Sequence, residues 1–254
     1  MKISIITVCY NSVSTIRDTF ESVLKQIYYD IDYIVVDGNS NDGTILIIKE
    51  FEPKFMGRMR WISEPDDGLY DAMNKGIKMA VGKVVGIINS DDFYHRNDVI
   101  EKVAEAFKKN KNIQAVFGDI RFVKKDNINK TIRYFSSKMF TPWKFRLGFM
   151  PAHPSFFTYK ENFDKFGYYK TDYKIAADYE LLVRFLYIHK LIYKYLNFDF
   201  LKMRVGGRSS ASLKNRFILN KEFLRGCKEN GIYTNIFILS LRYLSKIFEW
   251  FFKH

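Results

Sequence analysis

The 254-residue sequence contains only two cysteines, Cys9 and Cys227, which lie far apart in the chain. Neither belongs to a CxxC pair, so the sequence predicts neither a disulfide framework nor a cysteine-based metal site. Unpaired cysteines are typical of a reducing compartment, and we expect a cytoplasmic protein. Five prolines and 14 glycines are also too few for a low-complexity linker.

Long hydrophobic runs are absent as well. No stretch approaches the roughly 18–20 apolar residues that a helix needs to span a bilayer. The N-terminal "MKISIITVCYN" has an apolar run too short for the core of a signal peptide, and no small-residue cleavage site follows it. We therefore expect neither a transmembrane segment nor a secretory signal.

Motifs of other nucleotide-binding and nucleic-acid-binding classes are missing. "VCYNSV", after the first predicted strand, lacks the GxGxxG of nucleotide-dependent oxidoreductases, and the GxxxxGK[ST] of P-loop kinases does not occur. No RNA- or DNA-binding signature accompanies the basic charge, so we expect no nucleic-acid partner.

Charge of the two signs is unevenly distributed along the chain. Residues 1–100 contain 11 Lys/Arg and 15 Asp/Glu, whereas residues 101–254 contain 30 and 13. An acidic first part and a basic remainder indicate two tasks, one that uses carboxylates and one that faces an anionic partner or surface. The apolar content of 47% is sufficient for a sizeable core.

Predicted strands alternate with predicted helices in the first part. The strands are "ISIITVCYN", Tyr33–Val36, a short one in "MRWISEPDDG", "KVVGIINSDD" and "IQAVFGD", and the helices cover 14–26, 42–50, 69–80 and 97–108. This alternation predicts an α/β protein with a doubly wound, mostly parallel sheet, which binds ligands outside the carboxyl ends of its strands. The polar residues there form one acidic crevice: Asn11, Asp37, Glu64, Asp66, Asp91 and Asp92.

Six motifs occur in order over roughly residues 2–210: "SIITVCYN", "VVDGNSNDGT", "SEPDDGLYDAMNKGIKMAVG", "INSDD", "HPSFF" and "AADYELLVRF". Together they resemble the inverting family-2 glycosyltransferases of the nucleotide-diphospho-sugar transferase (GT-A) fold, in particular the bacterial branch that builds O-antigen, capsule and exopolysaccharide repeat units. The resemblance implies a GT-A catalytic domain over 1–212, with a nucleotide-binding half (1–100) and an acceptor-binding half (101–212). A helical extension, 213–254, follows.

The resemblance assigns the donor site to the first half. Asp37 matches the family's acid that hydrogen-bonds the uracil ring, although Asp-Gly is also a common turn pair. Thr7 and Asn11 are candidates for further base and ribose contacts. Asp66, with Asn74, would continue the base pocket across the loop after the third strand.

"NSDD" occupies the place of the family's DxD-type motif, with Ser90 where the first acid is usual. Asp91 would then contact the ribose hydroxyls, and Asp92 would bind a divalent metal that bridges the two phosphates. Mn²⁺ or Mg²⁺ is expected because carboxylate and phosphate oxygens are hard ligands. The alternative is an Asp pair that caps the next helix or closes a turn.

Asp178 is the candidate catalytic base because it resembles the family's acid at the start of a helix that faces the acceptor. Ala177 stands where the family commonly has Glu, and Glu180 is the nearest other acid. The alternative for Asp178 is simple stabilisation of the helix N-terminus. His153, between two prolines, and Glu180 are candidates for the acceptor or sugar pocket, and a structural role for His153 is equally open.

Basic residues that could neutralise phosphate are Lys75, Lys202, Arg204 and Arg208, for each of which a solvated surface role is as plausible. The implied reaction moves a hexose, galactose or glucose with or without an N-acetyl group, from a UDP-sugar to a lipid-diphosphate-linked saccharide. One displacement would form a β-linkage. The alternative is a nucleotidyltransferase-like or binding-only relative on the same fold, although the Gly-rich, basic loop of nucleotidyltransferases is absent.

The C-terminal "NIFILSLRYLSKIFEWFFKH" places Arg242, Lys246, Glu249 and Lys253 in one charged stripe of a predicted helix. Apolar residues fill much of the remaining surface. Such a helix can lie in a membrane interface, with its basic residues near anionic headgroups. We expect a peripheral protein at the inner face of the cytoplasmic membrane, and the alternative is a helix that docks on its own domain or on a second subunit.

Overall fold

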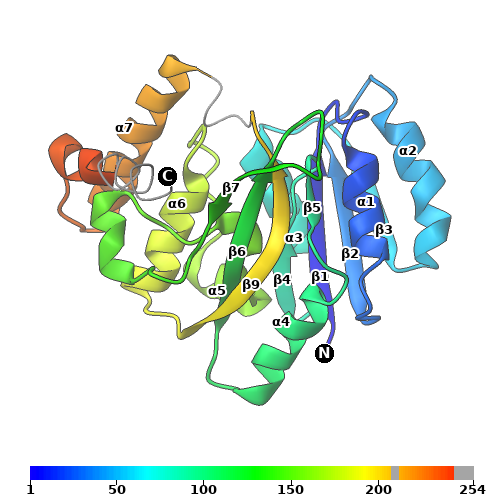
Figure 1. Cartoon of the computed structure of the whole chain (residues 1–254), viewed down its shortest axis with the longest axis horizontal. Coiled ribbons are helices and arrows are strands. Elements are labelled where there is room, and N and C mark those ends of the chain that lie inside the picture. The colour runs from blue at the N-terminus through cyan, green and yellow to red at the C-terminus, as the bar shows by residue number, and fades with distance from the viewer. Residues whose placement is uncertain (207–211, 243–254) are drawn as a thin grey trace.

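The computed structural model describes residues 1–206 and 212–242 and shows helices on both faces of one large sheet (Figure 1). The first half contains β1 (Ile3–Cys9), α1 (Ile16–Leu24), β2 (Ile31–Asp37), α2 (Thr44–Phe51), η1 (Glu52–Phe55), β3 (Met59–Ser63), α3 (Leu69–Met79) and β4 (Val84–Ile87). Its four strands pair in parallel. The alternating pattern of strands and helices in the sequence is confirmed here.

The second half is less regular. It contains β5 (Asp92–Tyr94), α4 (Val99–Lys109), β6 (Ala115–Val123), β7 (Thr131–Phe135), η2 (Pro142–Leu147), η3 (His153–Ser155), β8 (Phe157–Tyr159), α5 (Lys160–Phe166), α6 (Ala177–Leu182), the π-helix η4 (Val183–Ile188), β9 (Tyr193–Arg204) and α7 (Leu213–Glu229). Residues 236–242 are helical as well.

The nine strands of the described residues belong to a single sheet with the order β3-β2-β1-β4-β8-β6-β9-β5, and β7 pairs with β6. The pairs β4–β8, β6–β8, β6–β7 and β5–β9 are antiparallel, and the longer pair β6–β9 is parallel. The sheet is therefore mixed and mostly parallel. Because β8 joins β4 to β6, the two halves of the chain share one sheet.

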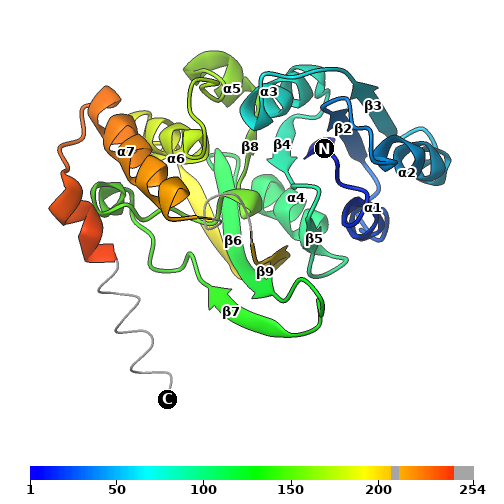
Figure 2. The same ribbon diagram turned by 90° about the horizontal axis from the view of Figure 1, so that it is seen from above.

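Alternate residues of the central strands face two separate hydrophobic cores. Ile3, Ile5 and Cys9 of β1 pack in a core with α1, α2 and α4, whereas Ile6 and Val8 pack in a core with α3 and α6. The view from above shows α1 and α4 on one side of the sheet and α3, α5 and α6 on the other (Figure 2). This two-sided burial explains why the strands of the first half are almost continuously apolar.

The strand predicted in "KVVGIINSDD" is β4, which ends at Ile87, so Asp91 and Asp92 follow it as expected. The sequence did not predict that Asp92 begins a separate strand, β5. The Asp92 amide donates a hydrogen bond to the Asn89 carbonyl (3.1 Å), which closes a turn between the two strands. β5 then pairs with β9, with Asp92 opposite Met203. Asp92 is thereby bonded into the sheet.

The described part of the C-terminal extension packs on the preceding part of the chain. The ring of Phe223 on α7 stacks on Tyr179 of α6, with ring centroids 3.9 Å apart, and Cys227 and Leu239 belong to the same core. In the described ranges, 1–206 and 212–242, no helix has the length and apolar character required to cross a bilayer. Lys246, Glu249 and Lys253 of the predicted charged stripe lie outside these ranges.

Candidate active site

Polar residues that follow neighbouring strands contact one another. The Asn11 amide donates to Ser40 Oγ (2.8 Å), and the Asn41 amide donates to Asn11 Oδ1 (3.0 Å), so the ends of β1 and β2 are linked. Ser12 Oγ and Ser90 Oγ, 2.8 Å apart, link the ends of β1 and β4. The strand ends of the first half therefore meet at one edge of the sheet.

Asp37 is fully buried at the end of β2. One carboxylate oxygen accepts from Ser40 Oγ (2.5 Å) and Cys9 Sγ (3.4 Å), and the other from the Ser40 amide (2.9 Å) and Ser63 Oγ (2.7 Å). Asp37 thus ties together the ends of three strands. A nucleotide base would have to displace one of the two serine hydroxyls to bind this carboxylate. The contact of Asp37 with uracil stays a prediction.

Asp66 lies directly beside the Asp37–Gly38 turn. A Cβ atom on Gly38 would come within 2.5 Å of Asp66 Oδ2, so any side chain at this position would displace the Asp66 carboxylate. The other oxygen of Asp66 accepts from the Gly68 amide (2.9 Å). The exposed ring of Tyr10 adjoins the same glycine. Tyr10 was not among the predicted site residues, although an aromatic residue at a strand end is a recognisable signal.

Lys75, on α3, contacts the acidic loop that precedes this helix. Its ammonium group contacts the Pro65 carbonyl (2.8 Å), Glu64 (2.9 Å) and Asp71 (3.4 Å). The hydrogen bond with Glu64 is the main cause that raises the pKa of Lys75. In this structure Lys75 neutralises neighbouring carboxylates.

The side chains of Thr7 and Asn74 are turned into the protein. Thr7 is fully buried, and its hydroxyl bonds to the Tyr33 hydroxyl (2.9 Å). Asn74 donates to the Tyr169 carbonyl (2.8 Å) and accepts from the Tyr169 amide (3.0 Å). The structure brings neither side chain to the surface of the crevice, because both satisfy buried polar groups elsewhere.

Asp91 and Asp92 lie where the chain turns into β5. Asp92 is 1% exposed, and its carboxylate accepts a hydrogen bond from Asn89 Nδ2 (3.1 Å). Burial and, secondarily, the charge of Asp91 raise the pKa of Asp92 well above its usual value, and burial also raises the pKa of Asp91. The surroundings of the pair therefore compensate negative charge on it poorly.

Arg204 reaches this pair from the end of β9. Its guanidinium donates to the Asp91 carbonyl (2.6 Å), pairs with Asp18 of α1 and lies 5.1 Å above the Phe93 ring. The charge of Arg204 is a smaller influence that lowers the pKa values of both aspartates. The structure thus brings Arg204 to the acidic pair. Lys202 lies on β9 opposite Phe93 of β5. Arg208 lies outside the described residues.

The oxygens around Asp92 fit a hard divalent cation. Asn89 Oδ1 is buried and has no hydrogen-bond partner among the described residues, and Nδ2 of the same side chain donates to the Asp92 carboxylate (3.1 Å). Within that part of the chain, no three His, Cys, Asp or Glu side chains come close enough to hold a metal ion by themselves. A bound cation would therefore need further ligands from phosphate and water, which is the usual situation for Mg²⁺.

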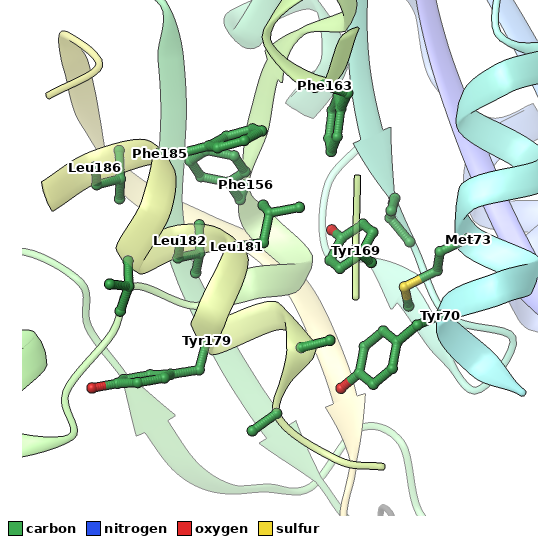
Figure 3. Close-up of a cluster of buried hydrophobic side chains, with 14 of the residues drawn as sticks. Tyr70, Met73, Phe156, Phe163, Tyr169, Tyr179, Leu181, Leu182, Phe185 and Leu186 are labelled. Carbon is green, nitrogen blue, oxygen red and sulfur yellow. The ribbon is translucent and has the colours of Figure 1, made fainter. Parts of the chain in front are cut away.

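Asp178 lies half-buried in the first turn of α6. Burial is the main cause that raises the pKa of its carboxyl group to about 6. Tyr70 of α3 and Tyr169 are its neighbours, with stacked rings whose centroids are 5.8 Å apart. Figure 3 shows both tyrosines in the gap between α3 and α6. Asp178 is thus a carboxyl group that changes its protonation near neutral pH.

His153 and Glu180 are held by other residues. His153 Nε2 bonds to the Tyr169 hydroxyl (2.6 Å), and burial lowers the pKa of His153 to about 4. Glu180 is fully buried and contacts Arg184 (2.9 Å), Lys170 (3.0 Å) and Asn230 (3.2 Å). Burial alone would raise its pKa, but these partners hold it below the usual value. Neither side chain is a free group in a pocket.

α3 connects the two groups of acids. It begins at Leu69, just after Asp66, and the hydroxyl of Tyr70 in its first turn donates to the Ile175 carbonyl (2.5 Å). Ile175 precedes Asp178 by three residues. Asp66, in the loop before α3, and Asp178, in the first turn of α6, therefore both lie near the N-terminus of α3.

The family model described as "Glycosyl transferase family 2" matches residues 4–170 of this chain. A Mycobacterium tuberculosis protein described as an uncharacterized glycosyltransferase is 35% identical over 185 residues, which cover 72% of this chain and 68% of that protein. The chain belongs to glycosyl transferase family 2. It is accordingly a nucleotide-sugar glycosyltransferase, and the nucleotidyltransferase alternative loses its support.

Solved structures agree on the GT-A fold. S. aureus TarS 1–349 in complex with UDP-GlcNAc superimposes with a TM-score of 0.71 at 18% identity, over 89% of this chain and 66% of that one. The mannosyltransferase PcManGT from Pyrobaculum calidifontis, in complex with GDP-Man and Mn²⁺, superimposes with a TM-score of 0.64 at 17% identity, over 90% and 63%. The chain thus spans slightly less than two thirds of each. The predicted fold class is confirmed.

Proposed function

We propose that this family-2 glycosyltransferase is an inverting enzyme that moves a hexose from a UDP-sugar to a hydroxyl group of a lipid-diphosphate-linked saccharide. The hexose is galactose or glucose, with or without an N-acetyl group. The product belongs to a bacterial surface polysaccharide such as O-antigen or capsule, made at the inner face of the cytoplasmic membrane. TarS was solved with UDP-GlcNAc, which supports a UDP-sugar donor by analogy.

The observation that carries the proposal is the position of Asp178, in the first turn of α6 and next to the start of α3, the helix that follows the Asp66 loop. Burial at this position raises the pKa of Asp178 to about 6. A carboxylate with a pKa near the working pH is an efficient general base, because it is ionised and still accepts a proton readily. Asp178 takes the proton of the acceptor hydroxyl, and the oxygen attacks the anomeric carbon while the nucleoside diphosphate leaves. One such displacement inverts the configuration, so an α-linked donor yields a β-linked product.

The strand-end residues bind the donor in this proposal. Asp37 and Asp66 face the base, Asn11 and Asp91 face the ribose, and Arg204 reinforces the phosphate side. Asp92, with the unpartnered Asn89 Oδ1, would supply oxygen ligands for Mn²⁺ or Mg²⁺, and the bound ion would neutralise charge on the departing diphosphate. PcManGT was solved in complex with GDP-Man and Mn²⁺, which supports a divalent metal by analogy.

The deciding experiment incubates the full-length protein with UDP-galactose, UDP-glucose, their N-acetyl forms and GDP-mannose, each with lipid-diphosphate-linked saccharide acceptors. We expect UDP release that depends on acceptor and on Mn²⁺ or Mg²⁺, stops with EDTA and returns when metal is added back. The product should show a β-anomeric proton coupling by NMR.

Each other result rejects a specific part of the proposal. An α-linked product would reject inversion, and transfer from GDP-mannose alone would reject the UDP-sugar. Donor binding without turnover on any acceptor would favour the binding-only alternative.

A further inference from the structure

Glu222, on α7, binds the segment of chain that leads into α6. Its side chain is 8% exposed, and one carboxylate oxygen accepts from the Lys174 amide (2.7 Å). The other accepts from the amides of Ile175 (2.9 Å) and Ala176 (2.8 Å). Three hydrogen bonds from consecutive amides to one buried carboxylate fix the position of this segment, because each charge-assisted bond is among the stronger ones in proteins.

The same segment is held from its other side by α3. The Tyr70 hydroxyl donates to the Ile175 carbonyl (2.5 Å), so Ile175 is bonded at its amide by α7 and at its carbonyl by α3. Asp178 follows two residues after Ala176, in the first turn of α6. The backbone just before Asp178 is therefore hydrogen-bonded from both sides, by α3 and by α7, which lie far apart in the sequence.

We propose that Glu222 is a positioning residue for Asp178, because its carboxylate anchors residues 174–176, the backbone that leads into the first turn of α6. This inference rests on the proposed role of Asp178 as the base. Glu222 was not among the predicted site residues, because nothing in the local sequence of α7 indicates its partners.

The groups that face Asp178 come from three segments. Tyr70 on α3 and Tyr169 in the loop after α5 are neutral, because burial raises their pKa values far above neutrality, and the charge of Asp178 raises them further. Glu222 on α7 adds a like charge that raises the pKa of Asp178 beyond the effect of burial. Removal of this charge should therefore lower the pKa of Asp178.

The test is Glu222→Gln in the full-length protein, with the Asp178 carboxyl followed by ¹³C NMR titration and assigned with Asp178→Asn. We expect the pKa of Asp178 to fall below the wild-type value of about 6. The acid limb of kcat/KM should move to lower pH by the same amount. We expect kcat to fall about tenfold, equivalent to the loss of one hydrogen bond, with an unchanged KM for the donor.

Two further variants separate charge from geometry. Glu222→Asp keeps the charge but shortens the reach, so the pKa of Asp178 should stay near the wild-type value while kcat falls. Glu229→Gln is the matched control on the same helix, because Glu229 contacts Lys170, Arg225 and Tyr173 rather than the 174–176 amides. It should leave the titration of Asp178 unchanged.

An unchanged Asp178 titration and acid limb in Glu222→Gln would overturn the proposal, even if stability falls. If that variant does not fold, an unchanged kcat in Glu222→Asp would overturn it. The NMR titration needs no turnover, so absence of transfer by the wild-type protein would reject the proposed function and leave the coupling of Glu222 to Asp178 to be decided separately.

Discussion

Asp178 and Glu180 stand two residues apart on α6, yet their surroundings separate their chemistry. Glu180 is bonded to Arg184, Lys170 and Asn230. These partners lower the pKa of Glu180, so it stays ionised well below neutral pH. Asp178 is half-buried without a cationic partner among the described residues, and burial raises its pKa to about 6. Of these two neighbours, Asp178 is the one suited to proton transfer.

Asp178→Asn should lower kcat by about 10²–10⁴-fold, the usual contribution of a general base. Binding of UDP with metal should be retained, as measured by calorimetry, because Asp178 lies apart from the strand-end acids. In the wild-type protein, the rate should fall as the pH drops through about 6, because the protonated carboxyl cannot accept a proton. Asp164→Asn, an exposed acid on α5, is the control. Wild-type turnover by Asp178→Asn would contradict the base assignment.

Asp92→Asn should abolish metal-dependent transfer and at the same time stabilise the metal-free protein. The Asp92 carboxylate is 1% exposed, and burial of a charge without a matched partner is unfavourable, whereas a neutral amide still accepts the bond from Asn89. Each 1 kcal/mol of stabilisation raises Tm by about 2–4 °C in a protein of this size. A lower Tm than the wild type in calorimetry with EDTA would contradict this account.

At the scale of elements, two glycines provide a matched test of packing. A Cβ on Gly226 of α7 would lie 3.5 Å or more from Tyr179 and Glu180, so Gly226→Ala should fit and improve the helix. We expect the free energy of unfolding to rise by up to about 1 kcal/mol. Gly86→Ala in β4 would place Cβ 2.2 Å from the Phe157 ring. It should lower that free energy by about 1–3 kcal/mol.

Urea denaturation followed by circular dichroism measures both glycine variants. Stabilisation of α7 also strengthens the element that carries Glu222, so Gly226→Ala should leave kcat unchanged or slightly higher. Equal effects of the two substitutions would show that the close approach of β4 to Phe157 is not a constraint on folding.

At the scale of the whole molecule, exposed apolar side chains gather after α7. Tyr233, Ile236, Phe237 and Leu241 are 70%, 44%, 82% and 48% exposed. We propose that this patch, with the basic charge of the second half, contacts an anionic lipid surface, where the acceptor would be presented. Deletion of 235–254 is an unsuitable test, because Leu239 is 1% exposed within the core.

Phe237→Ser combined with Leu241→Ser should weaken binding to anionic vesicles about tenfold or more, because a buried apolar side chain contributes about 1.5–3 kcal/mol. Salt should weaken the binding of the wild-type protein further, by screening. Leu46→Ser, an exposed residue on the distant α2, is the control. Unchanged co-sedimentation with vesicles would reject the membrane proposal and leave a second subunit as the partner of this patch.

The sequence by itself determined the order of elements in the first half of the chain, the family and the carboxylates at the strand ends. These features depend on short-range properties: the apolar periodicity of strands and helices, and the turn chemistry of stretches such as Asp37-Gly38 and "INSDD". Such patterns are readable because a strand or a helix must place its apolar face in the core wherever the chain leads.

Only the tertiary structure decided which side chains share a site. β9 pairs with β5, and this pairing brings Arg204 to Asp91 across 113 residues of sequence. Thr7 and Asn74 face buried partners, and Glu222 reaches the segment before Asp178 from a helix near the C-terminus. Burial and long-range pairing set the pKa values and orientations of these groups, and neither can be read from local sequence.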